Sequence, residues 1–242
     1  MKDKIKKEWE NINTNSDRTF NLSIIFVTIA LFIYCYFGSF SFFEKTFPLL
    51  DNLQYWKIIY HNTMSFVIFF CLGLLYCKFV IKKSPKSFGL QKGNIKLSLI
   101  LVLIALPITA ICGLVTTLNP EMSATYPLVD LKVYGVWYYV ILYFFSYFLY
   151  YVGWEYLFRG ILLKSSKNKL GVYSAILLST LVSALIHTSI AGFGKPMVET
   201  LSAIPAGLIF GYIAHKTDNI YTSLFIHFFV GLFTDLFIFL IV

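Results

Sequence analysis

The stretch Phe20–Phe37, with the sequence FNLSIIFVTIALFIYCYF, decides the fold class. It carries no charged side chain, and its length approaches the roughly 20 apolar residues that a helix needs to cross a bilayer. The preceding segment, Met1–Arg18, is polar and lacks the apolar core of a cleavable signal peptide. We therefore expect the first apolar run to remain in the protein as a membrane span.

Six further apolar runs follow along the chain. The seven expected spans are roughly 20–38, 58–81, 96–118, 134–164, 171–189, 200–215 and 220–242. Apolar stretches in 38–57 leave room for an eighth, partial span. The fourth run is longer than one crossing requires, so it is expected to tilt or to project into water. The sequence thus predicts an all-α, polytopic transmembrane helix bundle with 7–8 spans.

The composition excludes a soluble domain. Of the 242 residues, 58% are hydrophobic and 13% are charged, against about 25% charged residues in soluble proteins. The net charge of +8 would suit nucleic acid, but the lysines cluster in short loops between spans, where membrane topology explains them. We expect the partners to be the lipid bilayer and a peptide or protein substrate, and no nucleic acid.

The chain divides into three parts. Residues 1–19 form a cytoplasmic N-terminal segment, 20–130 the N-terminal transmembrane helices, and 131–242 a core with a polar site inside the membrane. The middle part offers little chemistry. Pro107 is expected to kink its span, and His61 is expected to be an interfacial polar residue. Its four cysteines lack the spacing of a metal site and are expected to be free thiols within the membrane: Cys35, Cys71, Cys77 and Cys112.

The last part contains ionisable side chains inside apolar runs. Each costs roughly several kcal/mol at such a depth, so each is a candidate functional residue. The six are Glu155, Arg159, His187, Glu199, His227 and Asp235. Glu155 and Arg159 are spaced i, i+4, on one helix face, and can form an ion pair. The alternative is a pair at a helix end, with Arg159 extending to the membrane surface.

The two histidines can reach Glu155 only if the helices shift relative to one another. Counting 1.5 Å per residue from the loops on one side puts Glu155 about 16 Å deep, His227 about 10 Å and His187 about 24 Å. Tilted or broken helices would bring these depths together. In the sixth span, small residues recur every four positions, at Ala203, Gly207 and Gly211, a pattern typical of close helix packing.

These residues resemble a known family. The segment Trp154–Gly160, WEYLFRG, resembles the first motif, Glu-Glu-x-x-x-Arg, of the CPBP family of CAAX proteases and bacteriocin-processing enzymes, also called Abi. His187 and His227 correspond to the histidines of its second and third motifs. The resemblance covers roughly residues 130–240, and the three motifs occur in the family's order.

The resemblance implies an intramembrane endopeptidase. In the family, a glutamate and a histidine are thought to activate water, and the last histidine, with an asparagine four residues on, is thought to stabilise the oxyanion. Carried over to this sequence, Glu155 is the general base with His187 as its partner. His227 polarises the carbonyl, and Arg159 holds Glu155.

The sequence departs from the family pattern at two positions. Trp154 stands where the family has its first glutamate, and Gly231 stands where it has the asparagine. A bacterial subgroup with Trp-Glu in the first motif also has a Gly-Lys-Pro-x-x-Glu loop, matched by Gly194–Glu199, and an aspartate after the last histidine, matched by Asp235. Glu199 and Asp235 are therefore candidates to replace the lost groups. The alternative is a loop carboxylate and a lumen-facing polar residue.

Other interpretations remain open. The resemblance favours a site without a cofactor, although a need for metal in the family is disputed, and Glu155, His187 and His227 also suit a catalytic zinc ion with an open water position. The chain can instead be a non-catalytic peptide-binding or bacteriocin-immunity protein. A proton-coupled transporter would use the same buried groups, but the sequence lacks the internal repeat that many transporters have. The resemblance implies the bacterial cytoplasmic membrane as the location.

The placement of basic residues predicts a cytoplasmic N-terminus. Of the 20 lysines and arginines, 16 lie in segments that the seven spans put on the N-terminal side, and four lie on the other side. Reporter fusions after residue 92 should therefore be active only as cytoplasmic reporters. Activity of an external reporter at this position would contradict the orientation.

Overall fold

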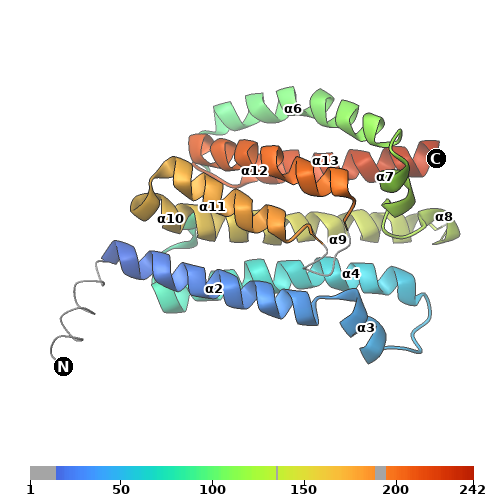
Figure 1. Cartoon of the computed structure of the whole chain (residues 1–242), viewed down its shortest axis with the longest axis horizontal. Helices are drawn as coiled ribbons and strands as arrows, with labels where there is room; N and C mark the ends of the chain where they lie inside the picture. The colour runs from blue at the N-terminus through green and yellow to red at the C-terminus, as the bar shows by residue number, and fades with distance from the viewer. Residues whose placement is uncertain (1–14, 135, 189–194) are drawn as a thin grey trace.

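The computed structural model describes residues 15–134, 136–188 and 195–242, which form helices and no strands. The π-helical segments are η1 (Phe66–Cys71), η2 (Tyr76–Ile81) and η4 (Tyr156–Leu162), and η3 (Pro85–Phe88) is a 3₁₀ turn. The α-helices are α2 (Asn15–Phe37), α3 (Phe40–Thr46), α4 (Leu53–Ser65), α5 (Leu72–Leu75), α6 (Ile95–Thr116), α7 (Pro120–Thr125), α8 (Leu131–Tyr134), α9 (Trp137–Glu155), α10 (Leu163–Leu170), α11 (Val172–Leu185), α12 (Met197–Thr217) and α13 (Tyr221–Ile241). The long helices lie roughly parallel or antiparallel to one another (Figure 1). The expected all-α membrane bundle is confirmed.

Five helices of the described chain are long and apolar enough to cross a membrane. They are Arg18–Phe37, Leu53–Ile81, Ile95–Thr116, Met197–Thr217 and Tyr221–Ile241. Two more of the expected spans are helical but are not among these five long apolar helices. The fourth is a continuous helix from α9 through η4 to α10, and the fifth, α11, is apolar but has only 14 residues.

Three details of the expected spans need correction. The region 38–57 holds the seven-residue α3 and the start of α4, so it contains no eighth span. The fourth helix continues to Leu170, beyond the expected end at 164, because α10 extends it with polar residues. Helix α11 ends at Leu185 rather than near 189, which places His187 in a turn.

The core of the molecule lies around the middle of the fourth helix. Every residue from 153 to 166 is buried. Apolar side chains of α2 and of the α4–η2 helix cover one side of it, including Tyr34, Phe69 and Tyr76. Helix α11 covers another, where the Ser179 hydroxyl donates to the carbonyl oxygen of Phe158 at 2.9 Å. The fourth helix is therefore the element on which the rest of the bundle is assembled.

Glycines let two pairs of helices approach closely. A Cβ atom at Gly113 of α6 would lie 2.7 Å from the backbone of Phe233 in α13. Figure 1 shows α6 arched over α12 and α13. Gly207 and Gly211 of α12 lie against the side chains of Thr180 and Ile176 in α11, where a Cβ would come within 2.8 and 2.9 Å of them. Two of the three small residues found in the sequence therefore serve helix packing, as expected.

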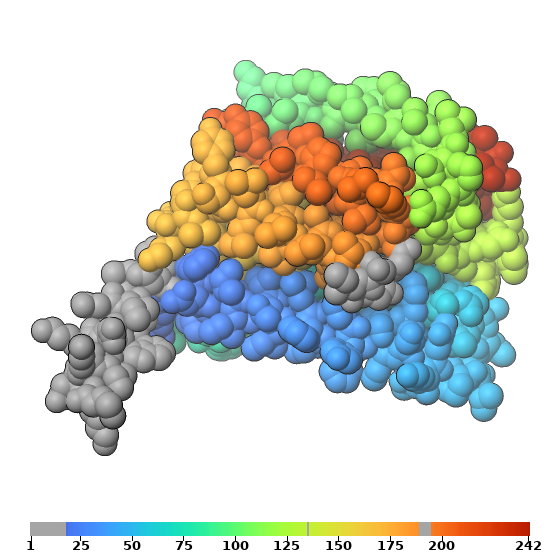
Figure 2. Space-filling model, in the orientation of Figure 1, coloured from blue at the N-terminus to red at the C-terminus, as the bar shows by residue number. Residues whose placement is uncertain are grey.

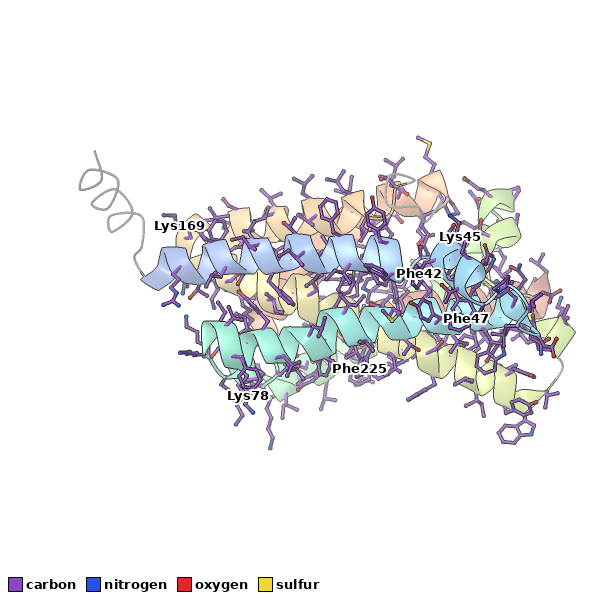
Figure 3. All side chains as sticks on the ribbon, turned by 90° about the horizontal axis from the view of Figure 1, so that it is seen from below. Phe42, Lys45, Phe47, Lys78, Lys169 and Phe225 are labelled. Atoms are coloured by element: carbon purple, nitrogen blue, oxygen red, sulfur yellow. The ribbon has the colours of Figure 1, made fainter. Side chains whose placement is uncertain are left out.

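Basic residues gather at one end of the bundle. Figure 3 shows Lys78 and Lys169 at the end where α2 begins, and Lys45 toward the opposite end. At the first end, the buried Lys164 donates to the carboxylate of Asp218, in the turn between α12 and α13. Burial raises the pKa of Asp218, but the hydrogen bond and charge of Lys164 outweigh it and hold the pKa below its ordinary value. The spatial arrangement agrees with the two groups of lysines defined from the sequence.

Side chains on the outside of the bundle are apolar, as contact with lipid requires. Those of α6 are the most consistent, with Leu99, Leu103, Ile104, Ile108 and Ile111 all more than half exposed. All four cysteines are free, as predicted: Cys77 is buried, and Cys112 of α6 is exposed.

The closest helix contact predicts a site that cannot accept a methyl group. A Cβ at Gly153 of α9 would lie 2.7 Å from the backbone carbonyl carbon of Ser65 in α4. Because backbone cannot rotate away, Gly153→Ala should destabilise the protein by about 1–3 kcal/mol, measured as a lower melting temperature in detergent. Gly73→Ala is the matched control, since its Cβ would meet no backbone, only the end of the Ile161 side chain and the ring edge of Tyr156, both at 3.0 Å. Equal melting temperatures for the two variants would contradict this account of the packing.

Candidate active site

A cavity of about 380 Å³ lies between the helices. Its polar lining comes from six side chains in particular: Tyr126, Arg159, His187, Lys195, Glu199 and His227. Figure 2 shows the chain around α7 between α6 and the start of α12, and Tyr126 directly follows α7. Most of the remaining lining is apolar or aromatic, as is usual for a site that binds an organic ligand.

Glu155 and His227 form the central contact. The Nδ1 atom of His227 lies 2.8 Å from Oε1 of Glu155, whose side chain is 0% exposed. The guanidinium Nη1 atom of Arg159 lies 3.7 Å from the same oxygen, so it attracts the carboxylate by charge without a hydrogen bond. A buried carboxylate is therefore compensated by one cation and one imidazole N–H, as its low-dielectric surroundings require.

The hydrogen bond fixes the tautomer of His227. A carboxylate can only accept, so Nδ1 of the neutral imidazole carries the proton and Nε2 carries a lone pair. The rings of Tyr151 and Phe210 pack on the imidazole, with centroids 4.5 Å and 4.7 Å away. His227 thus presents a basic nitrogen from a restrained ring, and it lines the cavity whereas Glu155 lies behind it.

The backbone changes where this motif occurs. Helix α9 ends at Glu155, and the π-helical turn η4 contains Arg159. Single π-helical turns inside α-helices are frequent at functional sites. The guanidinium of Arg159 lies between two rings, 6.0 Å from Phe158 and 5.8 Å from Phe210. Two of its nitrogens, Nε and Nη1, have no hydrogen-bond partner among the described residues.

His187 lines the same cavity but does not pair with Glu155 in the described structure. Its Nδ1 atom lies 2.8 Å from the carbonyl oxygen of Ser183, so this nitrogen also donates and leaves Nε2 as an acceptor. The indole of Trp154 meets the imidazole edge-on, with centroids 5.2 Å apart. The histidine bonded to Glu155 is therefore His227, whereas the sequence interpretation paired Glu155 with His187.

Glu199 belongs to a separate polar cluster in the cavity wall. It lies in the first turn of α12 rather than in a loop. Its Oε2 atom accepts a hydrogen bond from the Tyr126 hydroxyl at 2.6 Å, and its Oε1 atom lies 3.1 Å from Nζ of Lys195. Lys195 also donates to the Tyr126 hydroxyl. Lys195 therefore has two partners in the cavity wall, Glu199 and Tyr126.

Asp235 is buried outside the cavity lining. Its Oδ2 atom accepts a hydrogen bond from the Tyr143 hydroxyl at 2.5 Å, and Oδ1 has no partner among the described residues. The structure thus brings Glu155, Arg159 and His227 into contact, gives His187 and Glu199 places on the same cavity, and separates Asp235 from them.

Several cavity residues were missed by the sequence analysis. His61, to which the sequence analysis gave no chemical role, is buried, 2.7 Å from the Tyr34 hydroxyl, and lines the cavity. Tyr126 comes from the connection after α7, where nothing in the local pattern marks it. Tyr147 and Tyr151 lie four residues apart in α9 and were hidden in an aromatic-rich run. Their i, i+4 spacing with Glu155 was the available clue.

A metal ion does not fit the described side chains well. No group of three histidine, cysteine, aspartate or glutamate residues in the described parts of the chain could hold one. The Glu155–His227 hydrogen bond occupies the Nδ1 atom, and His187 uses its own Nδ1 atom on a backbone carbonyl. The described side chains therefore do not form a zinc site.

Residues 135–233 match the family model described as type II CAAX prenyl endopeptidase, Rce1-like. No curated protein and no solved structure matches the chain. The matched segment begins just before α9 and ends within α13, so it includes Glu155, Arg159 and both histidines. The resemblance to the CAAX protease family is confirmed over these residues.

The Lys195–Glu199 contact predicts coupled effects of mutation. Both side chains are largely buried, 14% and 22% exposed. Glu199→Gln or Lys195→Gln alone leaves one charge without its partner and should cost about 1–3 kcal/mol, measured from melting temperatures in detergent. The double variant should recover part of the loss, because both charges are then removed.

The same variants separate charge compensation from catalysis. If Glu199 only compensates Lys195, the double variant also recovers enzymatic activity. If Glu199 transfers protons, the double variant stays inactive although its melting temperature recovers.

Proposed function

We propose that this chain, with its match to the type II CAAX prenyl endopeptidase family, is an intramembrane endopeptidase that hydrolyses a peptide bond of a membrane-associated protein or peptide. One observation carries the proposal: the carboxylate of Glu155 is hydrogen-bonded, at 2.8 Å, to a histidine that faces a cavity inside the helix bundle. A carboxylate that orients an imidazole is a recurrent arrangement for activating a nucleophile.

In the proposed mechanism, His227 is the general base. Its Nε2 lone pair accepts a proton from a water molecule while the water oxygen bonds to the carbonyl carbon. Glu155 stabilises the imidazolium that forms, and Arg159 keeps Glu155 ionised by its charge at 3.7 Å. The C–N bond then breaks, and the proton on Nε2 passes to the leaving nitrogen. A carboxylic acid and an amine result, so the atoms of one water molecule are accounted for.

His187 would hold the same water molecule. Water has two O–H groups, and both histidines present an Nε2 acceptor because each uses Nδ1 as a donor. A water molecule that donates to both imidazoles would have its lone pairs directed away from them, toward a substrate carbonyl. This assignment exchanges the roles inferred from the sequence, since His227 rather than Glu155 takes the proton.

The location of the site supports an apolar, membrane-associated substrate. The cavity is lined mainly by aromatic and aliphatic groups, and the helices around it present apolar side chains to the outside. The name of the matched family concerns prenylated CAAX proteins. We therefore propose a lipid-modified or transmembrane peptide as the substrate class.

The test is cleavage by the purified protein in liposomes. The probes are a quenched fluorescent peptide ending in farnesyl-cysteine, two aliphatic residues and a variable residue, its unmodified form, and a set of transmembrane peptides. Wild type should cleave at least one of them. Glu155→Gln and His227→Ala should each lose about 10²–10⁴-fold in rate, the contribution of a positioned acid–base group.

Two controls accompany this assay. Glu44→Gln is the matched variant, because Glu44 pairs with Lys57 near the surface, far along the chain from the site; it should keep full activity. Treatment with EDTA should leave the wild-type rate unchanged, and a loss restored by zinc would overturn the metal-free mechanism. Tight binding of a probe without any cleavage would show instead that the chain is a peptide-binding protein.

A further inference from the structure

Two tyrosine hydroxyls occupy the space beside Gly231. A Cβ atom built on Gly231 would lie 2.8 Å from the hydroxyl oxygen of Tyr147 and even closer to that of Tyr151. The two hydroxyls are 3.1 Å apart, and Tyr151 donates to Tyr147. Both side chains are 6% exposed, and both line the cavity. No side chain larger than that of glycine fits at position 231 while both hydroxyls are in place.

The direction of this hydrogen bond leaves one proton available. Because Tyr147 accepts from Tyr151, its own O–H can donate elsewhere, and it makes no further side-chain hydrogen bond in the described part of the chain. Accepting a hydrogen bond also polarises a hydroxyl and strengthens it as a donor. Tyr147 thus presents a donor toward the cavity, and Tyr151 positions it.

The pair lies next to the proposed general base. The ring of Tyr151 packs on His227, with centroids 4.5 Å apart. Gly231 follows His227 by four residues, about one helical turn or about 6 Å along α13. The carbonyl carbon of the substrate would fit in that interval. On one side the attacking water would be hydrogen-bonded to His227, and on the other the carbonyl oxygen would accept a hydrogen bond from the Tyr147 hydroxyl. Each of these hydrogen bonds would be about 2.6–3.2 Å long.

We propose that the Tyr147 hydroxyl donates a hydrogen bond to the carbonyl oxygen of the scissile peptide as negative charge develops on it, and that Tyr151 is a positioning residue for Tyr147. The hydroxyl keeps its proton, and no covalent bond to tyrosine forms. Tyrosine hydroxyls in apolar sites act in this way in other enzymes. This inference rests on the proposed endopeptidase function.

The first experiment measures kcat and KM in the liposome assay, with the probe that wild type cleaves fastest. Tyr147→Phe removes one oxyanion donor and should lower kcat about 10²–10³-fold, with KM changed less than about twofold, because the bond strengthens only in the transition state. Tyr151→Phe should lower kcat by less, since it removes only the positioning group. Tyr138→Phe, an exposed tyrosine of the same helix, is the matched control and should behave as wild type.

A binding experiment excludes a purely structural effect. A peptide aldehyde of the cleaved sequence hydrates to a geminal diol, with two oxygens on one tetrahedral carbon, whereas the corresponding peptide alcohol carries one. Tyr147→Phe should weaken binding of the aldehyde at least about tenfold more than binding of the alcohol, because only the aldehyde hydrate carries both oxygens of the tetrahedral intermediate. Equal losses for both ligands would mean that Tyr147 only shapes the cavity.

A replacement experiment uses the space beside Gly231. In the Tyr147→Phe/Tyr151→Phe background, both hydroxyls are gone. The ring edge of residue 147, whose Cε1 atom lies 2.9 Å from a Cβ at position 231, then shifts slightly, and Gly231→Asn introduces an amide donor into the vacated volume. This triple variant should regain at least about tenfold in kcat. Gly231→Leu in the same background has nearly the same shape without a donor, and it should regain nothing.

The outcomes distinguish this inference from the proposed function. If Glu155→Gln abolishes cleavage while Tyr147→Phe keeps the wild-type kcat, the endopeptidase function stands and the tyrosine inference is wrong. If wild type cleaves no probe, the proposed function fails and the inference fails with it. Recovery with leucine as good as with asparagine would also overturn the inference.

Discussion

The structure depends on keeping one carboxylate charged in the interior of a membrane protein. Glu155 is fully buried, and moving such a group out of water costs several kcal/mol even after the protein relaxes. Two side chains compensate the charge of this carboxylate: Arg159, one turn later in the same helix, and His227, in the last helix. Because the second partner is 72 residues away, the carboxylate fixes how α13 sits against α9, and this contact defines one wall of the cavity.

The surrounding packing serves this contact. Gly153 lets α4 approach to backbone contact directly beside the motif, and the π-helical turn after Glu155 changes the direction in which the following side chains point. Ser179 satisfies the carbonyl oxygen of Phe158 within that turn. Trp154 fills the space between Phe158 and His187, with its indole against both rings. The residue that departs from the family motif therefore holds the second histidine in place.

Much of the fold was predictable because a bilayer imposes simple rules. Long apolar runs must be helices, so the spans and the ionisable groups within them follow from the sequence. The contact between Glu155 and His227 was harder to predict from the sequence, because straight helices would leave the two side chains about 6 Å apart in depth. In the folded bundle the two side chains nevertheless meet. The role of Lys195 and the positions of His61 and Tyr126 were not predictable. They depend on how the connection after α7 and the first part of the chain fold over the cavity, and no local pattern encodes this.

The two departures from the family motif have a common physical character. At position 154 a carboxylate is replaced by an indole, and at position 231 a carboxamide is replaced by the absence of a side chain. In both cases aromatic groups take the space: Trp154 itself at the first, and the hydroxyl ends of Tyr147 and Tyr151 at the second. Aromatic rings fill volume in an apolar interior at little conformational cost, and a phenol hydroxyl adds a hydrogen-bond donor at a fixed distance from the helix axis. Helix α9 supplies all four groups. Tyr147, Tyr151 and Glu155 follow one another at intervals of four residues, and Trp154 precedes Glu155 directly. One face of this helix therefore carries both the aromatic wall of the cavity and the carboxylate behind it.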